Sequence, residues 1–80
     1  MVTSEHQQER HRLLLAMKKA PDYYELAFSS AEHAGYLNGL HKAGVISEHT
    51  LAIYQREAST VSESVGCRLA SELDRAAAHN

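Results

Sequence analysis

The sequence predicts an all-α fold, a small helical bundle of about three helices built on an antiparallel αα-hairpin. The 80 residues include one proline and four glycines, and no run of alternating apolar and polar residues lies between turn signals, so strands have little support. Helix-capping patterns precede the expected helices, and Gly44 separates the two longest segments. We expect one helical domain over residues 1–80, with an N-terminal helix in 1–20 and a helical hairpin in 21–78.

The first expected helix begins near Ser4 and ends before Pro21. Ser4 and Gln7 have the spacing of a capping box, and two lysines suit the last turn of the helix dipole. The apolar residues come late, within residues 13–17. Since residues 5–12 have little to bury, we expect this part of the helix to be solvated or frayed.

The second expected helix has Pro21 in its first turn and runs to Ala43. A capping-box spacing between Ser29 and Glu32 leaves open a break or kink at Ser29–Ser30. One row at every fourth position consists almost entirely of small residues: Tyr23, Ala27, Ala31, Gly35, Gly39 and Ala43. Glycine inside a helix costs roughly 1 kcal/mol relative to alanine, so this row predicts close approach of another helix.

The stretch between the hairpin helices predicts a stapled turn. Gly44 suits the left-handed residue that ends a helix, with Val45 as the hydrophobic contact that follows it. Ser47 suits the N-cap of the next helix, and Ile46 and Leu51 have the spacing of a hydrophobic staple. The third helix then runs from Glu48 to about Ala78, with a kink left open in its middle near residues 62–66.

Two known patterns are similar to this turn. Short C-terminal oligomerisation (SHOCT) domains have a leucine-rich helix, a Gly-Ile-Thr-like turn and a second helix, and the matching positions are Leu37, Leu40, Gly44, Ile46, Ser47 and Leu51. The stretch also resembles the Gly-Val-Ser-x-x-Thr-Val turn of bacterial repressors, although Ile46 is inserted and Leu40 replaces a small residue. That resemblance implies DNA binding by the third helix, whose exposed residues would include Glu48, His49, Gln55, Arg56 and Glu57. One arginine among carboxylates argues against nucleic acid as the principal ligand.

Other functional classes find little support in the sequence. No two histidines lie four residues apart, no His-Glu-x-x-His motif occurs, and the only cysteine, Cys67, lies far along the third helix, so we expect no metal site. No phosphate-binding loop or nucleophile elbow occurs, so we expect no catalytic residues and no cofactor. The chain lacks the apolar segment of a secretory signal or a membrane span. We therefore expect a cytoplasmic protein without a membrane contact.

The remaining hypothesis is a small non-enzymatic regulator that acts by protein–protein binding, as an adaptor or as an inhibitor that covers a larger partner. The alternative is a helix-turn-helix-like DNA-binding regulator. A core of this size is thin, and the third helix should extend beyond the second, so we also expect a homodimer. The expected helix-packing or interface residues are Tyr23, Tyr24, Ala58, Ser62, Val65, Gly66, Leu69, Ala70 and Leu73. The rival cover for the third helix is the first helix, through Leu13, Leu14 and Met17.

Overall fold

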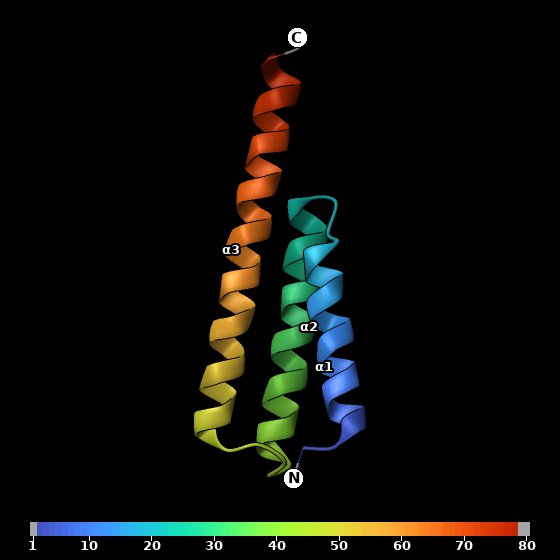
Figure 1. The fold of residues 1–80 in the computed structure, drawn as a ribbon, viewed down its shortest axis with the longest axis vertical. Helices are drawn as coiled ribbons and strands as arrows, with labels where there is room; N and C mark the ends of the chain where they lie inside the picture. Colours follow the sequence, from blue (N-terminus) through green and yellow to red (C-terminus); the bar gives the residue numbers. More distant parts are fainter. Residues whose placement is uncertain (1, 79–80) are drawn as a thin grey trace.

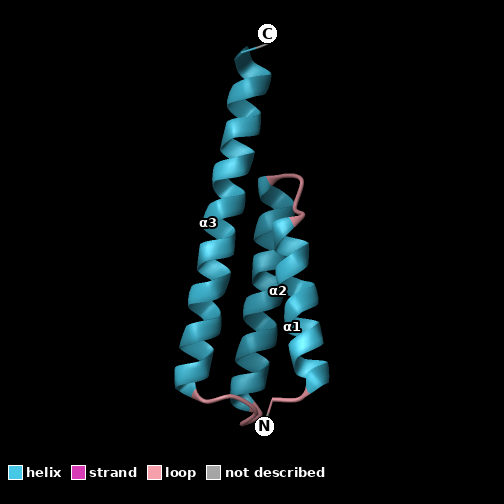
Figure 2. Cartoon of the chain, viewed as in Figure 1, coloured by secondary structure: helices cyan, strands magenta, loops and turns pink. Residues whose placement is uncertain are grey.

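A computed structural model describes residues 2–78 and confirms the predicted fold class. It contains three helices, α1 (Ser4–Lys18), α2 (Tyr23–Lys42) and α3 (Glu48–Ala78). Within these residues there is no strand. Successive helices run antiparallel, and each contacts the other two (Figures 1 and 2). The chain therefore forms an up-down-up bundle in which α2 and α3 make the expected hairpin.

The first helix begins at Ser4, as predicted, but its N-cap residue differs from the one expected. Thr3, rather than Ser4, is the N-cap: the His6 N–H donates to the Thr3 hydroxyl at 3.2 Å, and the Thr3 N–H donates to His6 Nδ1 at 3.1 Å. A histidine thus takes the place that glutamate or glutamine usually has in a capping box. Of the two alternatives for residues 5–12, the structure shows the solvated one: the segment is helical, not frayed, and most of it is exposed, although Arg10 contacts α3.

The start of α2 lies later than predicted. Asp22 is the N-cap and accepts a hydrogen bond from the Glu25 N–H at 2.8 Å, so Pro21 precedes the helix. The helix continues without a break through Ser29 and Ser30. Ser29 is buried on the core side, with 7 % of its surface exposed. Its capping-box spacing to Glu32 therefore does not begin a new helix.

The turn between α2 and α3 has the left-handed glycine and the serine cap that the sequence predicted. Gly44 has φ of +75°, in the left-handed region. Its N–H donates to the His41 carbonyl at 3.0 Å and the Val45 N–H donates to the Leu40 carbonyl at 2.9 Å, which together make a Schellman motif. The Thr50 N–H donates to the side-chain oxygen of Ser47 at 3.1 Å, which caps α3.

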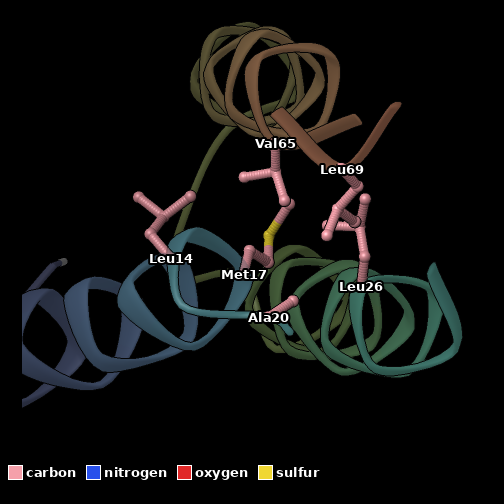
Figure 3. Close-up of a cluster of buried hydrophobic side chains, with 6 residues drawn as sticks. All are labelled: Leu14, Met17, Ala20, Leu26, Val65 and Leu69. Carbon is pink, nitrogen blue, oxygen red and sulfur yellow. The ribbon is translucent and has the colours of Figure 1, made fainter. Parts of the chain in front are cut away.

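The hydrophobic core lies where the end of α1 packs between α2 and α3 (Figure 3). Its central cluster consists of Leu14, Met17, Ala20, Leu26, Val65 and Leu69. Met17 lies at its centre, with 1 % of its surface exposed. The first helix thus covers Val65 and Leu69 of the third helix, which is the rival arrangement that the sequence left open, whereas Leu73 stays exposed.

The third helix extends well beyond the other two, as predicted from its length. It has 31 residues against 20 in α2, and it continues unbroken, without the kink considered near residues 62–66. Figure 1 shows its C-terminal part projecting past the α1–α2 connection. The longest dimension of the molecule is accordingly 52 Å, against 20 and 16 Å for the others.

The small-residue row of α2 does not pack where we expected. The buried residues of α2 are Leu26, Ser29, His33, Leu37 and Leu40, on the opposite side of the helix. No heavy atom outside the local backbone lies within 4 Å of a side chain's first carbon placed at Gly35 or Gly39. The close helix that this row predicts is therefore not one of the same chain, because the core side of α2 carries leucines, which bury more apolar surface than alanines and glycines do. A first side-chain carbon placed at Gly66 on α3 would likewise have no such heavy atom within 4 Å.

Candidate protein-binding surfaces

A groove forms where the extension of α3 leaves the bundle. It has a volume of about 160 Å³ and is lined by Pro21, Asp22, Tyr23, Leu69, Glu72 and Leu73. The Tyr23 hydroxyl donates to the Gly66 carbonyl at 3.4 Å, which holds the tyrosine beside α3. The Arg68 guanidinium donates to the Ala20 carbonyl and joins α3 to the same connection. These contacts give the groove a defined shape, and 60 % of the Leu73 surface in it is exposed.

The predicted interface residues separate into three groups. Val65 and Leu69 are buried in the core of the chain itself. Ala58, Ser62 and Gly66 are partly covered, on the side of α3 that faces the bundle. Exposed residues are Tyr23, Tyr24, Ala70 and Leu73. The structure brings Tyr23 and Leu73 together at the groove.

Two exposed aromatic residues of α2 lie outside the groove. Tyr24 has 77 % and Phe28 has 57 % of its surface exposed. The sequence analysis included Tyr24 and missed Phe28, although the two are four residues apart and share one side of the helix. A large residue facing outward beside the row of small residues was the signal that could have identified it.

Arg10, one of the basic residues of α1, makes its contacts within the chain. Arg10 forms an ion pair with Glu57 at 2.7 Å, and its guanidinium carbon lies 4.1 Å from the centre of the Tyr54 ring. The Gln7 amide donates to the Tyr54 hydroxyl at 3.1 Å. Only 17 % of the Arg10 side chain is exposed. These contacts fasten the first half of α1 to α3 and leave Arg10 little surface for an external phosphate.

A second groove, of about 260 Å³, lies between α2 and α3 and includes a buried histidine. His33 has 1 % of its surface exposed. Its Nε2 atom and the Ser30 hydroxyl oxygen are both buried without a hydrogen-bond partner among the described residues. The other polar residues along this groove are Gln55, Ser59 and Ser62. Burial lowers the pKa of His33, Arg10 lowers it further, and Glu57 opposes the shift.

We expect the free energy of unfolding to fall as the pH drops below about 6.5, the ordinary pKa of histidine. The folded chain holds His33 with a lowered pKa, so in this range the unfolded chain binds more protons. His33→Leu should reduce this pH dependence, and should stabilise the protein by about 1–2 kcal/mol at pH 7.5 by removing the unpaired nitrogen. Urea unfolding at pH 7.5 and 5.5 measures both effects. The control is His11→Leu, at an exposed position of α1; equal slopes in the two variants would contradict the expectation.

The arrangement of α2 and α3 differs from that of a DNA-binding helix-turn-helix. In that motif the two helices meet at roughly 90–120°. Here they lie side by side and antiparallel along the bundle (Figure 1). The start of α3 presents Glu48, His49 and Arg56 to solvent, and Glu57 is paired with Arg10. This geometry does not favour the DNA-binding hypothesis.

Neither a metal site nor a membrane span can be assigned among the described residues. Among residues 2–78, no group of three or more histidine, cysteine, aspartate or glutamate side chains could hold a metal ion. None of the helices in this part of the chain is long and apolar enough to cross a membrane. Cys67 is a free, exposed thiol on α3.

No protein-family model, curated protein or solved structure matches the chain.

Proposed function

We propose that the protein is a small cytoplasmic regulator that acts by binding another protein, as an adaptor or as an inhibitor, and that it does so without catalysis. The observation that carries the proposal is the projecting end of α3. Residues 70–78 extend past the ends of α1 and α2 (Figure 1) and are exposed along their whole length. Leu73 lies on this extension, in the groove beside Tyr23. An exposed leucine beside a shaped apolar groove is a suitable anchor for a partner.

The extension would bind by completing the bundle. Beyond Leu69, no described residue of α3 belongs to the buried core, and Leu73 lies beside α2 only at the groove with Tyr23. A helix from a partner can therefore lie along the rest of the extension. An apolar side chain of that helix would fill the space between Tyr23 and Leu73. Glu72, Asp74 and Arg75 on the extension would then contribute charged contacts at the rim of the interface. Binding at this end would let the bundle cover a functional surface of the partner.

A photo-crosslinking experiment in the native host tests this proposal. A photoreactive amino acid replaces Leu73 in one variant and Arg56 in the control, which is exposed on α3 but lies away from the groove. We expect illumination to produce a discrete adduct with another protein from position 73 and none from position 56. Adducts from both positions, or from neither, would contradict binding at the groove.

A further inference from the structure

The side of α2 that faces away from the core is unusual for an exposed helix surface. We call it the outward face of α2, and define it by Tyr24, Ala27, Phe28, Ala31, Gly35 and Gly39, which are all exposed. None of the six is charged, and the polar residues on this side, Asn38 and Lys42, lie toward its C-terminal end, whereas an exposed helix normally carries charged and polar residues along its length. The outward side of α3, by comparison, presents Arg56, Glu63 and Asp74. The outward face of α2 therefore has the composition of a covered surface.

Both kinds of residue on this face are unfavourable in an isolated chain. Tyr24 and Phe28 expose 77 % and 57 % of their surfaces to water. Gly35 and Gly39 each weaken a helix relative to alanine, yet no neighbouring atom requires a glycine there. Close contact with another helix would compensate for both, since it would bury the rings and use the space that the glycines leave.

We propose that the occupant of this face is a second copy of the chain, with the two α2 helices packed antiparallel. The face is complementary to itself. Its two aromatic residues are four positions apart, and so are its two glycines. When two copies meet about a two-fold axis near Ala31, Phe28 of each copy lies over Gly35 of the other, and Tyr24 lies over Gly39. One surface patch thus serves both copies, as a two-fold symmetric interface requires.

Charged residues lie at one end and one edge of this face. Lys42 is exposed at the C-terminal end of α2. Glu32 borders the face close to the axis, so the two copies of Glu32 lie near each other in the antiparallel pair. Each acts on Arg12 of its own chain, and this positive charge reduces their mutual repulsion. The antiparallel arrangement of the two helix dipoles is favourable.

The expected dimer is a weak one. A stable specific interface buries about 800 Å² on each partner, whereas this face has two large side chains and otherwise alanines and glycines. We expect a dissociation constant of roughly 10–100 μM, which corresponds to about 5.5–7 kcal/mol of binding free energy. The expected homodimer would thus form through the outward face of α2. This proposal is independent of the groove at Leu73, which the crosslinking experiment tests separately.

Sedimentation equilibrium of the full chain from about 1 to 500 μM tests the proposal, since this range spans the expected dissociation constants. Phe28→Ala removes a ring that should lie in the interface, and Gly35→Leu fills the space that should receive it. Gly35→Leu should fold normally, because nothing lies within 4 Å of that position in the chain, and circular dichroism checks this. The matched control is Ile53→Ala on α3, where 47 % of the isoleucine surface is exposed.

We expect the unmodified chain to dimerise within this range. Both α2 variants should raise the dissociation constant at least about tenfold, and Ile53→Ala should change it less than about twofold. A chain that stays monomeric at the highest concentration would overturn the proposal. A dimer that Gly35→Leu and Phe28→Ala leave unchanged would also overturn it, because it would have to form on another surface.

Discussion

Met17→Ala is expected to lower the free energy of unfolding by about 2–5 kcal/mol. Met17 has 1 % of its surface exposed and lies between α2 and α3 at the centre of the core (Figure 3). A core in a chain of this size seldom supplies more than about 3–5 kcal/mol. The variant should therefore be largely unfolded at 37 °C.

Urea unfolding followed by circular dichroism measures this effect, at a protein concentration of a few micromolar so that self-association contributes little. Leu15→Ala is the matched control on the same helix, because 41 % of the leucine surface is exposed. It should cost less than about 1 kcal/mol. Equal losses in the two variants would show that α1 does not bury the face that carries Met17.

The second large effect separates two leucines one turn apart on α3. Leu69 has 3 % of its surface exposed and Leu73 has 60 %. We expect Leu69→Ala to cost about 2–5 kcal/mol and Leu73→Ala to cost less than about 1 kcal/mol. The same urea titration compares them. A large loss in Leu73→Ala at low protein concentration would show that the extension of α3 belongs to the core of the single chain and is not free for a partner.

The sequence predicted best those features that depend on residues close together in the chain. The turn from Gly44 to Ser47 is the clearest case, because its left-handed glycine and its serine cap act through backbone groups within a few residues. The projection of α3 beyond α2 could be predicted because more residues follow the Gly44 turn than lie between Pro21 and that turn. The N-cap of α1 is Thr3 and not Ser4, because both residues are good N-caps and the pairing of Thr3 with His6 lies outside the usual capping-box pattern.

The sequence could not show which side of α2 faces the core. A row of small residues and a row of large ones both suit helix packing, and the choice depends on contacts with α1 and α3 that are distant in the chain. The ion pair of Arg10 with Glu57 and the contact of Gln7 with Tyr54 have the same origin. They join segments 47 residues apart, so no local sequence pattern predicts them. For the same reason only part of the predicted interface is accessible to a partner, because Val65 and Leu69 pack within the chain.

The outward face of α2 connects these observations, since a two-fold pairing there explains both its exposed rings and its glycines. The most direct test is a disulfide across the proposed axis. Ala31→Cys is made in a Cys67→Ser background, with Ala52→Cys, at an exposed position of α3, as the control. After mild oxidation at about 100 μM, in the upper part of the expected range of dissociation constants, the Ala31→Cys variant should form a disulfide-linked dimer and the Ala52→Cys variant should stay mostly monomeric. Equal and low yields from both positions would contradict the pairing of two copies through α2.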